Sequence, residues 1–202
     1  MMLPDRAGEQ IRIGVAITVP EPYGSALQHA RASFGDPLAG DIPPHITLLG
    51  PTVVDPDELA DVSSHLARVS TGSRPFVLHL RGTGTFRPIS PVVFMQVVEG
   101  IAECEQLEST VRSGPLSQDL RFNYHPHVTV AHEVPDPDLD RAFDEMADFD
   151  ARFVVSGFQF YEHGDDNVWR PVRDYLLTGS SARARTSIAG ARTPGALGNV
   201  GS

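Results

Sequence analysis

The stretches HITL (His45–Leu48) and HVTV (His127–Val130) repeat one pattern, in which histidine and threonine alternate with two apolar residues. A proline precedes each stretch, and the two histidines lie 82 positions apart (127 − 45). Side chains of a β-strand alternate between the two faces of a sheet. Each stretch, as a strand, therefore presents an imidazole and a hydroxyl on one face and an apolar anchor on the other. Two such strands at one cleft predict a site suited to opening a phosphodiester.

The pattern suggests a division of roles among four residues. His45 and His127 form the expected acid–base pair, because imidazole titrates near neutrality and one ring can take a proton while the other gives one. Thr47 and Thr129 are expected to donate hydrogen bonds to the non-bridging phosphate oxygens, although threonine also favours strands for its shape alone. The pattern leaves open which imidazole is the acid.

These residues resemble the two signature motifs, His-x-Thr/Ser-x, of the 2H phosphoesterase superfamily, and in particular its bacterial 2′-5′ RNA ligase-like or cyclic phosphodiesterase branch. The resemblance runs from about Arg12 to about Thr178. It implies a pseudo-symmetric, two-lobed α+β fold, in which each lobe is an antiparallel sheet with flanking helices and the active site lies in the cleft between lobes. It also implies cofactor-free hydrolysis of 2′,3′-cyclic phosphates on nucleotides or RNA ends, with RNA ligation as the reverse reaction.

Hydrophobic periodicity and turn residues predict the order of the elements. A strand, a helix and a motif strand occur twice, which indicates a duplicated unit. The predicted strands cover 11–19, 44–49, 76–80, 92–98, 127–131, 153–161 and 168–177, and the predicted helices cover 22–34, 57–69, 101–112 and 137–149. One bilobal domain is expected over 11–179, after a flexible segment 1–10 and before a disordered tail, 180–202. Three arginines in that tail suggest either no function or weak capture of RNA.

Charge and composition exclude several classes of enzyme and of binding partner. All sixteen basic residues are arginine, which excludes a lysyl-nucleotide ligase and a Walker-type phosphate loop. Residues 1–179 carry 13 basic and 26 acidic residues, so the body has a formal charge of −13 and is not expected to bind duplex nucleic acid. No apolar run is long enough to span a membrane, and the N-terminus has no secretory pattern. The single cysteine, Cys104, is expected to have a structural role and not to act as a nucleophile. We expect the protein to be a monomer in the cytoplasm.

Three further residues are candidates for substrate binding. Arg121 and Tyr124 lead into the second motif, and Arg87 lies in a loop before a predicted strand, after Phe86. An arginine can pair with phosphate and an aromatic face can stack on a base. It is equally consistent with the sequence that the two arginines are simply exposed to solvent and that the tyrosine packs against its neighbours.

A metal site is the alternative suggested by His125 and His132, which flank the second motif. Strand phase places His132 on the face opposite His127, and no carboxylate or cysteine completes a ligand spacing. No metal is therefore expected.

Two rival functions remain open. One is a 2H enzyme for another cyclic or 2′-5′-linked nucleotide. The other is a nucleotide- or RNA-end-binding protein without turnover, although such a protein has no need of all four motif residues.

Overall fold

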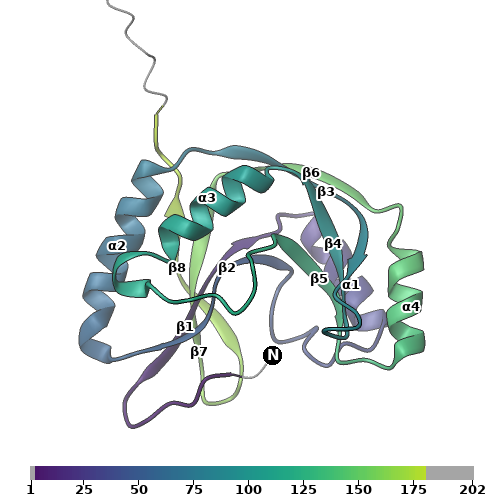
Figure 1. Ribbon diagram of the computed structural model, residues 1–202, viewed down its shortest axis with the longest axis horizontal. Helices are drawn as coiled ribbons and strands as arrows, with labels where there is room; N and C mark the ends of the chain where they lie inside the picture. Colours follow the sequence, from purple (N-terminus) through teal and green to yellow (C-terminus); the bar gives the residue numbers. More distant parts are fainter. Residues whose placement is uncertain (1–2, 181–202) are drawn as a thin grey trace, which may run out of the picture.

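The computed structural model of the chain describes residues 3–180 and consists of two four-stranded sheets with four α-helices (Figure 1). Two short 3-10 turns, Pro56–Glu58 and Gly114–Leu116, accompany them. The strands are β1 (Ile11–Thr18), β2 (His45–Val54), β3 (Phe76–Thr85), β4 (Val92–Glu99), β5 (His127–His132), β6 (Asp150–Val155), β7 (Gly157–His163) and β8 (Trp169–Leu176). The helices are α1 (Tyr23–Ser33), α2 (Leu59–Gly72), α3 (Ile101–Val111) and α4 (Asp136–Glu145).

The two sheets have the same internal plan. Sheet A has the order β2-β1-β7-β8 and sheet B the order β5-β4-β3-β6, and every neighbouring pair is antiparallel. In each sheet a motif strand occupies one edge, paired with the strand that precedes it along the chain. This confirms the α+β architecture of two pseudo-symmetric lobes.

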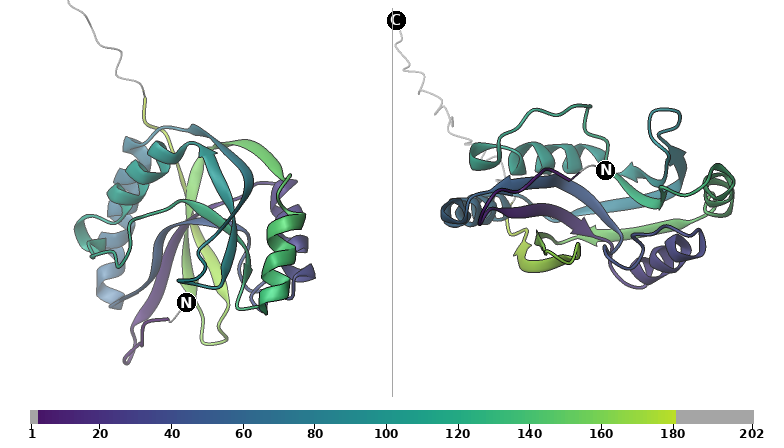
Figure 2. Two further views of the ribbon diagram at one scale, coloured as in Figure 1. Left: turned by 45° about the vertical axis from the view of Figure 1, so that its right-hand side comes forward. Right: turned by 90° about the horizontal axis from the view of Figure 1, so that it is seen from below.

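The helices are exchanged between the lobes. α1 connects two strands of sheet A yet packs against β5 of sheet B, whereas α3 connects two strands of sheet B yet packs against β2 and α2. As a result α2 and α3 flank sheet A, and α1 and α4 flank sheet B (Figures 1 and 2). The predicted strand–helix–strand repeat is confirmed, but each unit spans both lobes.

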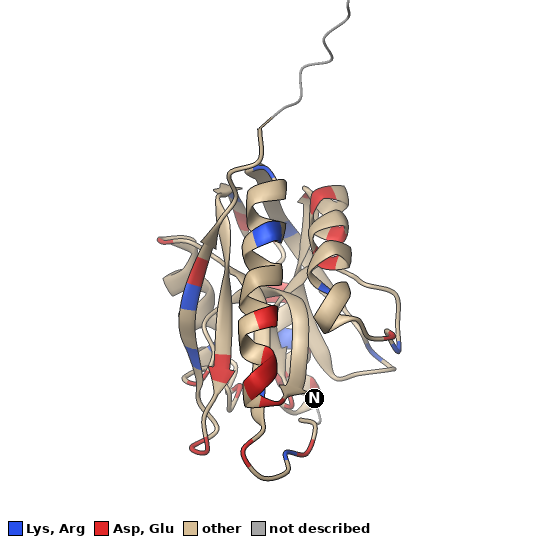
Figure 3. Ribbon diagram, turned by 90° about the vertical axis from the view of Figure 1, so that its left-hand side faces the viewer, with Lys and Arg blue, Asp and Glu red and all other residues tan. Residues whose placement is uncertain are grey.

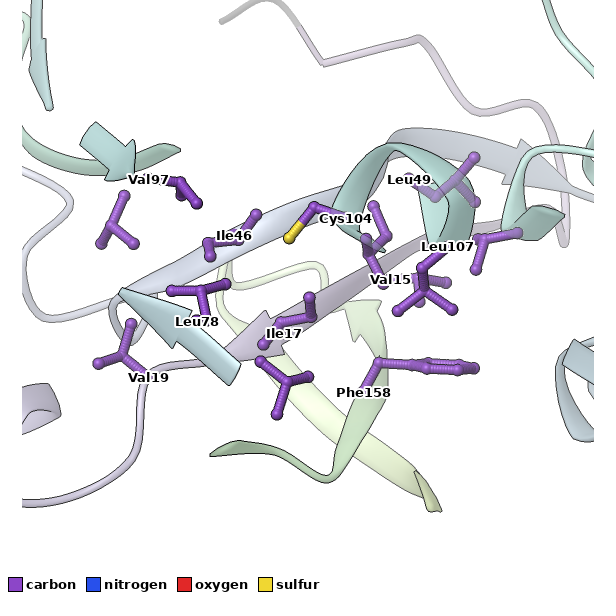
Figure 4. Packing of buried hydrophobic residues seen from close by; sticks show 14 of the residues in the cluster. Val15, Ile17, Val19, Ile46, Leu49, Leu78, Val97, Cys104, Leu107 and Phe158 are labelled. Atoms are coloured by element: carbon purple, nitrogen blue, oxygen red, sulfur yellow. The ribbon is translucent and has the colours of Figure 1, made fainter. Parts of the chain in front are cut away.

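The exchange of helices joins the two lobes in one core. Side chains of β1 and β2 meet α3, and Leu78 of β3 lies close by (Figure 4). Cys104 of α3 is free and fully buried in this cluster, and burial raises the pKa of its thiol to about 12. The thiol is therefore protonated at neutral pH and serves as packing, as predicted.

One predicted strand, 153–161, is wrong. The chain leaves sheet B at Val155, passes through Ser156, and enters sheet A at Gly157. A Cβ on Gly157 would lie 2.7 Å from the carbonyl oxygen of Tyr175, so only glycine fits this crossing. The predicted pairing across the following turn is confirmed, because β7 pairs with β8.

Several boundaries also differ from prediction. β2 continues through Gly50-Pro51 to Val54, since Pro51 lies on an edge strand, where proline is tolerated. Asp55 caps the turn 56–58, which leads into α2, and acidic residues gather at that end of the helix (Figure 3). Residues 3–10 form no helix or strand, and the carbonyl of Pro4 accepts hydrogen bonds from Arg12. The predicted tail lies almost wholly outside the described residues.

Candidate active site

Both motif histidines stand at the first position of an edge strand. β2 begins at His45 and β5 begins at His127, and these two strands lie side by side where the sheets meet (Figure 1). Across the sheet, Thr18 of β1 is the partner of His45, and Gln96 of β4 is the partner of His127. The fold therefore brings together two motifs that are 82 residues apart in the sequence (127 − 45).

Burial along the motif strands alternates as predicted. The apolar residues between and after the histidine and threonine, two in each motif, are at most 2% exposed. His45, Thr47, His127 and Thr129 are instead half-buried, on the face of each strand that the core does not cover. Each imidazole thus shares a face with its threonine.

The two imidazoles are held in the same way. His45 Nδ1 lies 2.8 Å from the carbonyl oxygen of Pro43, and His127 Nδ1 lies 2.7 Å from that of His125. A carbonyl oxygen can only accept a hydrogen bond, so each Nδ1 carries the hydrogen. Each neutral ring therefore keeps an unprotonated Nε2, which is the atom available for taking a proton.

The surroundings of both imidazoles favour their neutral form. Burial lowers the pKa of His127 to about 4; the charges of His125 and His45 act in the same direction, and the hydrogen bond to the His125 carbonyl opposes them. Burial also lowers the pKa of His45; its hydrogen bond to Pro43 opposes this, and the charge of Arg31 adds to it. A bound anion would raise both pKa values, because a nearby negative charge favours the protonated ring.

A buried ion pair organises the loop that leads to His45. The Arg31 guanidinium of α1 donates to Asp36 at 3.0 Å, and both side chains are at most 5% exposed. Arg31 also donates to the carbonyl of Ile42, and Asp36 accepts from the backbone of Leu38. These contacts fix the segment that ends at Pro43, the hydrogen-bond partner of His45.

Aromatic rings surround His127. The ring centroid of Phe86 lies 4.9 Å from that of His127 and the centroid of Phe94 lies 5.2 Å away. His125 packs against the same two phenylalanines. Phe94 was not anticipated as a site residue, because its place here depends on its register opposite Thr129, which periodicity does not reveal.

A pocket opens beside His45 on the exposed face of sheet A. Its walls include Ala16, His45, Thr47, Tyr161 and Trp169. The ring of Trp169 lies over Gly14, where a Cβ would be 3.1 Å from a ring carbon. Sequence reasoning missed Tyr161 and Trp169, because they come from the C-terminal strands β7 and β8, which return to extend sheet A beyond β1.

The three further candidates for substrate binding, Arg87, Arg121 and Tyr124, each have other contacts in the structure. Arg87 pairs with Asp140 of α4 at 2.8 Å, and Arg121 is exposed, with its guanidinium 5.2 Å from the ring centre of Phe122. Tyr124 packs against the core; burial raises the pKa of its hydroxyl, which has no hydrogen-bond partner among the described residues. None of the three lines the pocket beside His45.

The histidines that flank the second motif do not form a ligand set. His132 Nε2 lies 3.6 Å from Glu133, and His125 contacts the aromatic rings described above. Within residues 3–180, no group of three or more His, Cys, Asp or Glu side chains could hold a metal ion. In the same part of the chain, no helix is long and apolar enough to cross a membrane.

A family model described as the 2′-5′ RNA ligase superfamily matches residues 19–167, a range that contains both motifs and most of the chain. The chain belongs to the 2′-5′ RNA ligase superfamily. The family expected from the two motifs is thus confirmed.

Curated relatives agree with this family. A Bacillus licheniformis protein named "Putative phosphoesterase" is 30% identical over 144 residues, which are 70% of this chain and 85% of the relative. A Bacillus cytotoxicus protein of the same name is 30% identical over 163 residues, 79% of this chain and 92% of that relative. Family and relatives together support phosphoesterase activity of the 2H type.

Solved structures share the fold. E. coli LigT complexed with 3′-AMP matches with a TM-score of 0.64 and 22% identity, over 84% of this chain and 99% of LigT. The protein TT0787 of Thermus thermophilus matches with a TM-score of 0.54 and 26% identity, over 84% of this chain and 100% of that protein. The bilobal architecture is therefore that of LigT.

Proposed function

We propose that this superfamily member is a metal-independent phosphodiesterase that hydrolyses 2′,3′-cyclic phosphates on nucleotides or RNA ends. One observation carries the proposal: His45 and His127 begin two adjacent edge strands, and each has its Nδ1 hydrogen bound to a backbone carbonyl. Each Nε2 is then free to exchange a proton with the substrate. The structure of LigT complexed with 3′-AMP lends support, because 3′-AMP is a product of opening 2′,3′-cyclic AMP.

The proposed reaction is an in-line displacement at phosphorus. The Nε2 atom of one neutral imidazole takes a proton from water as the water oxygen bonds to phosphorus. The bond between phosphorus and one ribose oxygen breaks, and the second imidazole, protonated, gives its proton to that oxygen. The product is a nucleoside monophosphate, and the two rings have exchanged protonation states. Thr47 and Thr129 donate hydrogen bonds to the non-bridging oxygens as negative charge develops.

The binding of substrate favours uptake from solvent of the proton that the mechanism needs. Both imidazoles are neutral in the empty site at pH 7, since their pKa values are lowered. The anionic cyclic phosphate raises these pKa values and favours a site with one proton on the pair. The same displacement, with a 5′-hydroxyl of a second RNA end in place of water as the nucleophile, joins RNA ends without a nucleotide cofactor: the new bond forms between that oxygen and phosphorus as the ribose oxygen leaves. Water is the more abundant nucleophile, so we expect hydrolysis to dominate.

The proposed partner is a small nucleotide or a single RNA end. The formal charge of −10 and the acidic end of α2 argue against duplex nucleic acid (Figure 3). We further propose a monomer that acts in the cytoplasm, in keeping with a single cysteine that is buried and unpaired.

Product analysis tests the proposal. Purified protein is incubated with 2′,3′-cyclic nucleotides in the presence of EDTA, and products are separated by chromatography. We expect a nucleoside 2′- or 3′-monophosphate, formed at the same rate with and without the chelator. A rate that falls with EDTA and returns with added metal would overturn metal independence. Binding without any product would instead identify a nucleotide-binding protein.

A further inference from the structure

Three side chains beside His45 form a hydrogen-bonded group with no assigned role. Thr18 Oγ1 and Tyr161 Oη each lie 2.5 Å from Gln159 Oε1 and 2.9 Å from each other. Gln159 Nε2 donates to Asp174 at 2.7 Å. We call Thr18, Gln159 and Tyr161 the hydroxyl cluster.

Both hydroxyl hydrogens of the hydroxyl cluster are used within it. The carboxylate of Asp174 only accepts, so it fixes the amide of Gln159 with Oε1 toward the two hydroxyls. Each hydroxyl has one hydrogen, and the short contacts among the three oxygens require both hydrogens to lie between them. What remains toward the surroundings is a set of lone pairs. The two hydroxyls can therefore accept hydrogen bonds but have no hydrogen left to donate to a phosphate oxygen.

The hydroxyl cluster lies on the site's own face. Thr18 is the cross-strand partner of His45, and Gln159 pairs with Ala16, the partner of Thr47. Tyr161 lines the pocket with His45 and Thr47, and the ring of Trp169 forms an apolar wall of the same pocket. The pocket thus combines a flat apolar surface with the acceptor oxygen of Tyr161, and Thr18 and Gln159 lie beside it on the same face of the sheet.

We infer that this pocket holds the nucleoside part of the substrate, and that the hydroxyl cluster accepts a hydrogen bond from a hydroxyl or amino group there. The inference rests on the proposed function and adds to it a rule of specificity. In a 2′,3′-cyclic phosphate both secondary ribose oxygens are esterified. The remaining donors are the 5′-hydroxyl and the N–H groups of the base, so a substrate that lacks the right one is a poorer substrate.

Matched substrates and variants test this rule. The three substrates are 2′,3′-cyclic AMP, its 5′-deoxy analogue and its purine analogue without the amino group. For the wild-type protein we expect one analogue to lose about threefold to tenfold in kcat/KM, the range of one net hydrogen bond. The analogue whose kcat/KM falls identifies the substrate group that donates the hydrogen bond.

The variants separate recognition from structure. In Tyr161→Phe and in Thr18→Val an acceptor oxygen is gone. The ratio of kcat/KM between 2′,3′-cyclic AMP and the poorer analogue should therefore fall toward one. Tyr175→Phe is the control: its hydroxyl lies 3.1 Å from Ser63 and the residue is buried in the core, away from the pocket. This control should discriminate as the wild type does. A cluster that only ties β1 to β7 would leave discrimination unchanged in every variant and overturn the inference.

A second readout separates this inference from the proposed function. If none of the three substrates is turned over, their binding is measured by calorimetry. Discrimination in binding then supports the hydroxyl cluster while the proposed hydrolysis fails. Equal binding of all three, or no binding, overturns the inference.

Discussion

The imidazole of His127 meets the ring of Phe86 edge to face, with centroids 4.9 Å apart and planes at 90°. Phe86 in turn packs on Phe94 at a centroid distance of 4.4 Å, so two phenylalanines lie against the imidazole. Their rings keep water from it, and this desolvation is the main cause of its lowered pKa.

Removing Phe86 should raise the pKa of His127. In Phe86→Ala water reaches the ring, and the pKa rises from about 4 toward the ordinary 6.5. Below pH 6.5 less of the imidazole is then neutral, so the acidic limb of the kcat/KM profile should move to higher pH. An NMR titration of the unliganded protein measures the pKa directly. Phe122→Ala, at an exposed phenylalanine, is the control, and equal titrations of both variants would contradict the prediction.

Replacing either motif histidine should slow turnover by about 10²–10⁴-fold, the usual contribution of a positioned proton carrier. The double variant should lose much less than the product of the two single losses, because the pair works as a unit. Steady-state rates of His45→Ala, His127→Ala and the double variant measure this. His29→Ala removes an exposed histidine that bonds only to its own helix and should keep the wild-type rate. Full activity in either single variant would rule out the proposed pair.

Anion binding should take up a proton. The pKa of His127 is about 4 in the empty site and rises beside a bound phosphate, so the complex holds more protons than the free protein. Affinity for inorganic phosphate or 3′-AMP should therefore fall as pH rises through the pKa of the complex. Calorimetry in buffers of different ionisation enthalpy counts the protons. An affinity that is constant from about pH 5 to 8, with no proton uptake, would refute this picture.

Breaking the buried pair between Arg31 and Asp36 should destabilise the fold. Asp36→Ala leaves a buried guanidinium without its carboxylate, which typically costs about 3–5 kcal/mol. The pair between Arg152 and Glu99 has two hydrogen bonds of 2.9 Å but is exposed, so Glu99→Ala should cost less than about 1 kcal/mol. Urea unfolding of both variants gives the two free energies of unfolding. Equal losses would mean that burial does not set the value of this pair.

Local pattern was enough to predict the four helices, most of the strands and the burial of the four motif residues. Alternation identifies β2 and β5 with their buried and half-buried faces, and three-to-four spacing identifies all four helices. These signals are local, because they depend on residues within one turn of helix or one strand. Duplication of the motif then predicts the two lobes.

Long-range pairing was not predictable in this way. Strand-forming residues lie on both sides of Ser156 and Gly157, so the local pattern does not show that β6 and β7 belong to different sheets. The positions of Phe94, Tyr161 and Trp169 follow from register between distant strands, and the exchange of α1 and α3 follows from packing of faces that look alike in sequence. The pocket beside His45 therefore required the structure.

The crossing at Ser156 also sets the order in which a nascent chain can assemble. β1 leaves the ribosome early, yet its second neighbour, β7, begins 146 residues later (157 − 11). Until residue 163 has been synthesised, one edge of β1 lacks its partner, and such an edge invites pairing with other chains. Helix α1, meanwhile, awaits β5. Sheet A can therefore reach its full set of strands only after the second half of the chain has been made, and its open edge is most exposed to wrong partners during that interval.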